Sequence, residues 1–304
     1  MRVAAIDVGT NSTRLLVAEA IEQGYRPLDR RMTITRLGEG VDRSRALSDE
    51  ALRRTFSTIA EYAAICGEYG VERIKVTGTS AVRDARNQET FFDGVRRLTG
   101  GEPEVLTGEL EGRATFEGVV SDLPAGEPIV VVDIGGGSTE LIVGRLEPER
   151  LVSLDIGCVR LFEKHLVSDP PAAAEVDALR AEVTGSLRAA RDQLDVPPGS
   201  RLVGVAGTVT QLATLKAGVP VYDPEITHHA VLTHGDVRLL AKRLESLPFE
   251  KRKAVRGLDA GRVDVIVAGA EILLCVMETF DLGEITVSEK DILDGLVLQL
   301  IAQR

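Results

Sequence analysis

Two stretches of the chain repeat one pattern of apolar and polar positions, at residues 3–17 and 130–141. Each begins with an apolar run that ends in an aspartate, passes through a glycine-containing turn and a Ser-Thr pair, and returns to an apolar run. This pattern predicts a strand, a tight turn and a second strand. Because the two copies match in order and spacing, we expect two related domains, each carrying one such turn.

The elements expected around each turn also repeat in order. Before a Pro- and Gly-rich patch at residues 123–128, the pattern predicts strands at 2–8, 14–20, 25–35, 74–77 and 104–107, and helices at 48–70, 88–98 and 109–120. After it, the pattern predicts strands at 129–133, 139–145, 151–155, 201–205 and 284–287, and helices at 158–166, 175–194, 207–217, 235–246, 249–256, 262–280 and 290–303. We therefore expect an α/β chain of two duplicated βββαβαβα domains, residues 1–124 and 125–304, divided at the patch.

The composition narrows the class of protein. The chain has 304 residues, 44% of them hydrophobic, which is enough for two packed domains. Its formal net charge of -11 argues against a protein that coats nucleic acid. Its three cysteines lack CxxC spacing, and neither a signal-peptide pattern nor an apolar run of about 18 residues is visible. We therefore expect a cytoplasmic protein with neither a nucleic-acid nor a membrane partner.

The two turns suggest phosphate chemistry. Glycines at 9 and at 135–137 permit close backbone approach, so that successive N–H groups can form a concave nest for an anion. Asp7 and Asp133 precede the turns, and a carboxylate beside bound phosphates is well placed to hold Mg²⁺. The alternative for either turn alone is a glycine-rich hairpin in which the aspartate caps its own turn. Two matching turns are harder to explain by packing.

Three further stretches add candidate residues whose roles stay open on the residues alone. Arg83 follows a strand end and is able to hold a phosphate or to pair with Asp84. Glu109 and Glu111 begin a helix, either as ordinary first-turn acids or with one of them as a base that activates water. The strand–glycine–helix junction at 206–208 offers N–H groups for another phosphate.

Two βββαβαβα halves that each open with an Asp-Gly turn resemble the actin, hsp70 and sugar-kinase (ribonuclease H-like) superfamily. The resemblance implies an interdomain cleft in which phosphates are bound. It implies a phosphoryl substrate but not a particular reaction.

Several stretches together resemble the exopolyphosphatase / guanosine pentaphosphate phosphohydrolase (Ppx/GppA) family, in the order that the family has them. They are residues 5–12, 36–40, 79–85, 107–113, 132–141, 206–208 and 262–269. The resemblance implies a Mg²⁺-dependent phosphohydrolase whose catalytic glutamate carries over to Glu111 and whose triple-glycine aspartate carries over to Asp133. Leu110 and Gly112 depart from the family pattern Ser-Gly-x-Glu-Glu-Ala-Arg, which leaves Glu109 as an alternative base.

The resemblance also bears on size and partners. Longer members of the family carry an HD-like C-terminal domain, for which this chain has no room, so we expect the short two-domain form. The resemblance further implies a homodimer, a link to the stringent response, and a last helix near 290–304 that packs back on the first domain. It favours short polyphosphate or nucleotide-like substrates.

From the residues and the resemblance together, we predict an exopolyphosphatase that removes the terminal phosphate of short-chain inorganic polyphosphate. The alternatives are hydrolysis of guanosine pentaphosphate, a superfamily kinase that uses ATP, and a non-enzymatic alarmone sensor. The predicted catalytic residues are Glu111 and Asp133, and the predicted Mg²⁺ ligands are Asp7, Asp133 and Glu140. The predicted phosphate-binding residues are Gly9, Thr10, Asn11, Ser12, Arg14, Arg83, Gly135, Gly136, Gly137, Ser138, Gly207, Thr208 and Arg262.

Overall fold

The computed structural model describes residues 1–124 and 126–303, and the chain divides into two compact units. The first unit is Met1–Asp122 with Lys290–Arg304, and the second is Leu123–Glu289. Residues 125 and 304, where the expected second domain begins and ends, lie outside the described residues. The last helix, α13 (Ile292–Ala302), is part of the first unit and packs against its strands.

The first unit is built on a mixed sheet of five strands in the order β3-β2-β1-β4-β5. The first turn connects β1 to the antiparallel strand β2, while β1 also pairs in parallel with β4. The strands are β1 (Arg2–Val8), β2 (Ser12–Ala20), β3 (Tyr25–Ile34), β4 (Arg73–Gly78) and β5 (Glu104–Val105). The helices that join them are α1 (Val41–Ser44), α2 (Asp49–Glu68), α3 (Ser80–Asp84), α4 (Gln88–Thr99) and α5 (Gly108–Val120).

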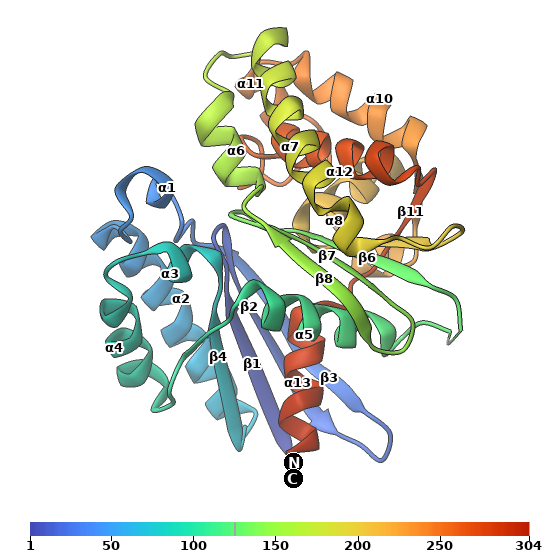
Figure 1. The fold of residues 1–304 in the computed structure, drawn as a ribbon. Coiled ribbons are helices and arrows are strands. Elements are labelled where there is room, and N and C mark those ends of the chain that lie inside the picture. The colour runs from blue at the N-terminus through green and yellow to red at the C-terminus, as the bar shows by residue number, and fades with distance from the viewer. Residues whose placement is uncertain (125, 304) are drawn as a thin grey trace. The chain divides into compact units, whose positions relative to one another are not determined.

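Helices cover both faces of this sheet, with α2 and α4 on one face and α5 and α13 on the other (Figure 1). Successive strand residues point to opposite faces. In β1, Ile6 and Val8 therefore join the core under α2, whereas Val3 and Ala5 join the core under α13. Asp7 continues the series of Val3 and Ala5, so it lies at the end of the α13 face.

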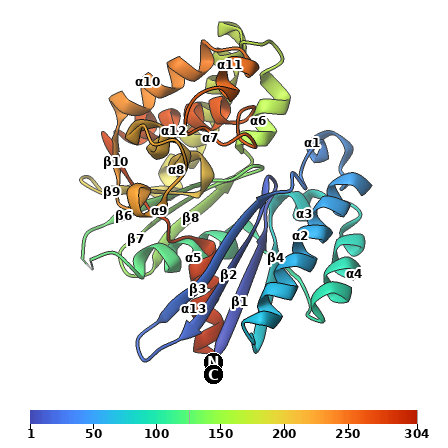
Figure 2. The same cartoon turned by 180° about the vertical axis from the view of Figure 1, so that it is seen from behind.

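The second unit has a mixed sheet of six strands in the order β10-β11-β9-β6-β7-β8, and the second turn connects β6 to β7. The strands are β6 (Ile129–Ile134), β7 (Thr139–Gly144), β8 (Pro148–Leu154), β9 (Arg201–Val205), β10 (Val231–Thr233) and β11 (Glu284–Val287). The helices are α6 (Cys158–His165), α7 (Ala173–Leu194), α8 (Ala206–Ala217), α9 (Pro224–Thr227), α10 (His234–Glu245), α11 (Phe249–Lys253) and α12 (Ile266–Phe280). Most of these helices gather over one face of the sheet (Figure 2) and enclose a single large core.

The predicted α/β fold class is confirmed, and the main differences lie between residues 218 and 266. The helix expected at 262–280 begins only at Ile266. The reason is local: the Asp259 and Asp264 side chains accept hydrogen bonds from backbone N–H groups one or two residues ahead, which holds this segment in turns. The short elements α1, α3, α9 and β10 were not expected.

Among the described residues, none of the helices has the length and apolar character needed to cross a membrane.

Candidate active site

The first turn, Gly9–Ser12, is closed by a hydrogen bond of 2.9 Å from the Gly9 N–H to the Ser12 carbonyl. Two of its other carbonyls face the loop at residues 35–38: that of Thr10 accepts from Gly38, and that of Asn11 accepts from Thr35 and Arg36. In a trans peptide the carbonyl and the following N–H point to opposite sides. The N–H groups of Asn11 and Ser12 are therefore directed away from this loop.

The second turn, Gly135–Ser138, has the same construction. The Gly135 N–H donates to the Ser138 carbonyl at 3.0 Å. A Cβ added to Gly135 would lie 3.1 Å from that carbonyl, and one added to Gly9 would lie 3.2 Å from the Ser12 carbonyl. The two turns are thus closed by the same hydrogen bond and leave equally little space beside their first glycine, as the sequence repeat predicts. Both offer outward N–H groups, which suits the binding of phosphate oxygens.

Asn11 adds a side-chain donor at the first turn. Its side chain belongs to a residue that is only 7% exposed, and its Nδ2 has no hydrogen-bond partner among the described residues. A buried amide without a partner costs free energy unless a ligand completes it. This supports the predicted assignment of Asn11 to phosphate binding.

Asp7, on β1 beside the first turn, is engaged by an arginine. Arg14 lies directly opposite Asp7 on β2, and its Nη2 is 2.7 Å from Asp7 Oδ2. The same guanidinium reaches Asp291 Oδ2 at 2.5 Å, while Thr77 Oγ1 donates to Asp7 Oδ1 at 3.3 Å. The structure therefore places Arg14, predicted to bind phosphate, between two carboxylates. Both oxygens of the predicted metal ligand Asp7 accept hydrogen bonds, Oδ2 from Arg14 and Oδ1 from Thr77.

The equivalent position beside the second turn carries the opposite charge. Glu140 on β7 lies directly opposite Asp133 on β6, in the place that Arg14 takes opposite Asp7. Both carboxylates are buried, and Glu140 Oε1 accepts a hydrogen bond of 2.6 Å from Ser153. Like charges directly opposite one another on paired strands are unfavourable. Two neighbouring carboxylates beside an anion nest form a hard-oxygen donor set, which fits Mg²⁺.

Glu111 and Arg83 are brought together in the first unit. Glu111 lies in the first turn of α5, after the cap residue Thr107, and is 9% exposed. Arg83 Nη1 is 3.4 Å from Glu111 Oε2 and donates to the Leu106 carbonyl at 2.7 Å. Glu109, by contrast, is exposed and pairs with Arg113 at 3.1 Å. Of the two acids at this helix start, Glu111 is the one that the fold encloses.

The topology of the first sheet explains why these side chains share one edge. β1, β4 and β5 run parallel, with Asp7 beside Thr77 and Thr77 beside Glu104 in register. Arg83 follows the end of β4, and Glu111 follows the end of β5. The carboxyl ends of parallel strands are where α/β folds collect ligands.

In the second unit, α8 begins at the same sheet edge as the second turn, since Asp133 pairs with Val205. A Cβ added to Gly207 would lie 1.9 Å from Cζ of Arg262, so the guanidinium rests directly on this glycine. Burial raises the pKa of the nearby Cys158 thiol to about 11, which keeps it protonated near neutral pH. Arg262 and the Thr208 side chain are both neighbours of Cys158, so the predicted residues Gly207, Thr208 and Arg262 form one cluster.

Several residues that contact these groups were not predicted. They are Thr77 and Asp291 near Asp7, Ser153 near Glu140, and Gly157 and Arg160 behind the second turn. Of these, only Gly157 had a sequence signal, because a glycine follows the third strand of each half, at Gly38 and Gly157.

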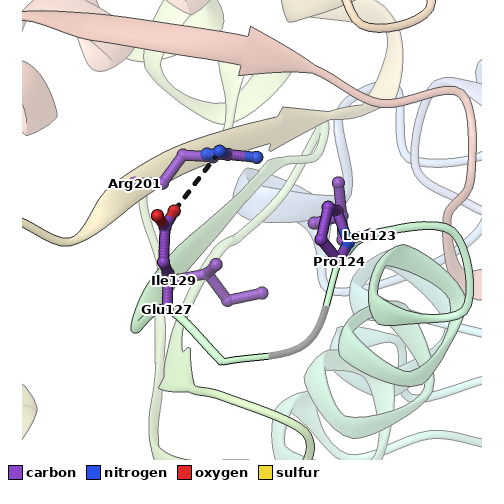
Figure 3. A pocket seen from close by; sticks show the side chains of 5 residues that line it. All are labelled: Leu123, Pro124, Glu127, Ile129 and Arg201. Atoms are coloured by element: carbon purple, nitrogen blue, oxygen red, sulfur yellow. Dashed lines mark hydrogen bonds and ion pairs between the residues drawn. The ribbon is translucent and has the colours of Figure 1, made fainter.

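A small pocket of about 170 Å³ lies elsewhere in the second unit. Leu123, Pro124, Glu127, Ile129 and Arg201 line it, with Glu127 and Arg201 paired at 3.3 Å (Figure 3). Ile129 is the first residue of β6, whereas Asp133 is near its end. The pocket is therefore separate from the second turn and contributes none of the predicted residues.

Each α/β unit has a turn with outward N–H groups beside a buried carboxylate, which suits a protein of the phosphate-binding class. The profile of the Ppx/GppA phosphatase family matches residues 16–303. The chain is 39% identical to "Exopolyphosphatase 2" of Mycobacterium tuberculosis, with 98% of each chain covered. It is 29% identical to the guanosine-5'-triphosphate,3'-diphosphate pyrophosphatase of Vibrio vulnificus, with 99% of this chain and 59% of that protein covered. The chain belongs to the Ppx/GppA phosphatase family, which confirms the resemblance seen in the sequence.

A solved structure agrees with this assignment. The Ppx/GppA family member of Aquifex aeolicus is 33% identical, with 100% of this chain and 98% of that chain covered and a TM-score of 0.85.

Proposed function

We propose that the protein is an exopolyphosphatase that hydrolyses the terminal phosphoanhydride bond of short-chain inorganic polyphosphate. The observation that carries the proposal is the duplicated turn, whose N–H groups face outward in both copies beside buried carboxylates. The 39% identity to a protein named exopolyphosphatase over nearly the whole chain supports the choice of substrate.

Glu111 is the proposed general base. Its enclosed carboxylate beside Arg83 is suited to orient a water molecule and to accept its proton. The water oxygen forms a bond to the terminal phosphorus as the bridging P–O bond breaks, and the shortened chain keeps the bridging oxygen. Arg83 and the N–H groups of the first turn, which belong to the same unit as Glu111, stabilise the negative charge on the transferred phosphoryl group, which is the main demand of this reaction.

Asp133 and Glu140 are the proposed ligands of Mg²⁺. Two buried carboxylates on neighbouring strands match the usual magnesium site, in which one or two carboxylates and substrate phosphates complete the coordination. The bound ion supplies neutralisation of phosphate charge. We assign Asp7 a different task, because its oxygens already accept hydrogen bonds from Arg14 and Thr77. In this proposal Asp7 holds Arg14 in place beside the first turn.

The test is the variant Glu111→Gln, which keeps the size of the side chain and removes its basicity. Turnover of polyphosphate should fall by about 10² or more while polyphosphate binding is retained. Glu109→Gln is the matched control, because Glu109 lies two residues away on the same helix but is exposed. Wild-type turnover in Glu111→Gln, measured as phosphate release without ATP, would overturn the assignment.

Guanosine pentaphosphate is a second candidate substrate, because a relative with 29% identity carries the name of its hydrolase. Competition between tripolyphosphate and guanosine pentaphosphate in one phosphate-release assay separates the two. The ATP-dependent kinase is less well supported, since the Gly207 surface that would meet a nucleoside is covered by the guanidinium of Arg262. A non-enzymatic sensor does not account for the enclosed Glu111.

We also propose, from the family resemblance, that the protein is a cytoplasmic homodimer connected with the stringent response. Light scattering of the purified protein measures its oligomeric state directly.

A further inference from the structure

The backbone carbonyls of the three glycines in the second turn point to one neighbouring segment, residues 157–160. The Gly135 carbonyl accepts from the Cys158 N–H at 3.0 Å, and the Gly136 carbonyl accepts from the N–H groups of Val159 and Arg160 at 2.9 and 3.1 Å. These donors are the first N–H groups of α6, which have no partner inside their own helix. The turn therefore completes the start of α6, and α6 fixes two peptide planes of the turn.

The Arg160 side chain fixes the third plane. Its Nε donates to the Gly137 carbonyl at 2.8 Å, and the arginine side chain is only 12% exposed. The carbonyls of Gly135, Gly136 and Gly137 thus all face residues 157–160. Because each peptide is trans, the N–H groups of the next three residues, 136–138, are directed to the other side. In the described part of the chain, no hydrogen bond from these three N–H groups is seen.

Gly157 allows this arrangement by its lack of a side chain. A Cβ at this position would lie 2.3 Å from the carbonyl carbon of Gly136 and 2.4 Å from that of Gly137. Both contacts are with backbone, which cannot swing aside as a long side chain does. Any larger residue at 157 would therefore displace the turn itself.

The first unit repeats the device with different parts. Gly38, in the loop after β3, donates its N–H to the Thr10 carbonyl at 2.8 Å, and a Cβ there would lie 2.2 Å from Thr10 Cγ2. Segment 157–160 follows β8, the third strand of the second unit, as this loop follows β3. Each turn thus has a backing segment at the same place in its unit. Because a backing segment recurs at the same place in both units, we infer that it serves the binding of ligand by the turn and is more than an accident of local packing.

We propose that Gly157 and Arg160 are positioning residues that set the orientation of the 136–138 N–H groups toward substrate phosphate. The inference rests on the proposed function. Without the backing segment, the three consecutive glycines are free to rotate their peptide planes, because glycine tolerates both signs of φ. The donors would then no longer converge on one anion, and the binding of polyphosphate would weaken.

The test compares Gly157→Ala and Arg160→Ala with two matched controls. Gly185→Ala adds the same methyl group in α7, where nothing lies within 4 Å of it. Arg150→Ala removes another arginine of this unit that bonds a backbone carbonyl, that of Asp195 at 3.1 Å. For both test variants kcat/KM with tripolyphosphate should fall about 10- to 100-fold, as expected for the loss of one or two hydrogen bonds to a charged ligand. The controls should stay within about twofold.

Amide NMR separates positioning from a loss of structure. With tripolyphosphate added in EDTA, so that it is bound but not turned over, the wild-type amides of both turns should shift. In Arg160→Ala the responses of residues 136–138 should be lost, while those of Asn11 and Ser12 remain, and Arg160→Lys should recover part of the effect. Wild-type shifts and wild-type kcat/KM in both test variants would overturn this inference alone. The absence of any shift at either turn of the wild-type protein would overturn the proposed phosphate site.

Discussion

The two turns share a closing hydrogen bond, but the residues opposite their aspartates carry opposite charges. Opposite Asp7 stands Arg14, and opposite Asp133 stands Glu140. The first pair balances its charge within the protein at an Nη2–Oδ2 distance of 2.7 Å. The second pair brings two buried carboxylates together, which favours a bound cation. Both turns thus keep the same closing hydrogen bond, whereas the residue opposite the aspartate has opposite charge in the two units, and it is the acidic pair to which our proposal assigns Mg²⁺.

The first turn is also tied to the end of the chain. Arg14 bonds Asp291, which caps α13, and Arg30 reaches Asp294 on the same helix at 2.5 Å. Tyr25 donates to Asp294 as well. These contacts connect the strands beside the first turn to α13 through buried charges. The charge pair of the first unit therefore has a structural task that its counterpart in the second unit lacks.

The largest effect is expected from Glu140→Arg, which gives the second turn the charge of the first. Activity with Mg²⁺ should fall by about 10² to 10³, because neutralisation of phosphate charge by the ion is worth several kcal/mol. The milder Glu140→Gln should raise the Mg²⁺ concentration needed for half activity by about tenfold. Glu149→Arg, at an exposed position on β8, is the control and should leave both quantities unchanged. An unaltered magnesium requirement in Glu140→Gln would contradict the division of tasks.

The second largest expected effect is a fall in the free energy of unfolding when the charge pair beside the first turn is broken. Arg14→Met leaves Asp7 and Asp291 buried without their shared cation, so the free energy of unfolding should fall by about 3 kcal/mol or more. Urea denaturation measures this difference. Arg113→Met, which breaks the exposed pair with Glu109, should cost less than about 1 kcal/mol. Equal losses in the two variants would show that the Arg14 pair is not a buried structural contact.

Contacts between side chains that lie far apart in the sequence could not be predicted from it. The turns and the Ser48 cap of α2 follow from local patterns of a few residues, whereas the residues at the start of α5 left the roles of Glu109 and Glu111 open. Arg14 was expected on phosphate, because nothing near it indicated that Asp291, 277 residues later, would reach it. Arg160 was missed because its partner is a carbonyl oxygen, which every residue has. Such contacts depend on the packing of whole elements and leave no local signal.

A second pair of acidic residues lies among the helices of the second unit, and one of the two has a raised pKa. Glu271 on α12 is fully buried, with Glu245 of α10 and Arg180 of α7 beside it. Burial and the bond with Glu245 raise the pKa of Glu271 from 4.5 to about 7. The folded state favours the protonated form of Glu271, and the stability that this contributes is complete below pH 4.5. It is lost as the pH rises through about 7.

The smallest expected effect follows from this shift. The free energy of unfolding should fall by about 2 kcal/mol between about pH 5 and about pH 8. In Glu271→Gln, which stays neutral, this fall should largely disappear, and stability at the higher pH should exceed that of the wild type. Repeating the denaturation series with added Mg²⁺ should leave the dependence of the free energy of unfolding on pH unchanged, because our proposal assigns the ion to Asp133 and Glu140. If the free energy of unfolding of Glu271→Gln still fell by the same amount over this pH range, a group other than Glu271 would be responsible.

The most direct measurement of the central claim is an anomalous difference map from crystals grown with Mn²⁺, as a substitute for Mg²⁺, and tripolyphosphate. The account predicts a peak in contact with Asp133 and Glu140 of the second unit, with Arg14 still paired to Asp7 in the first. A peak on Asp7 with Arg14 displaced, and none between Asp133 and Glu140, would contradict it.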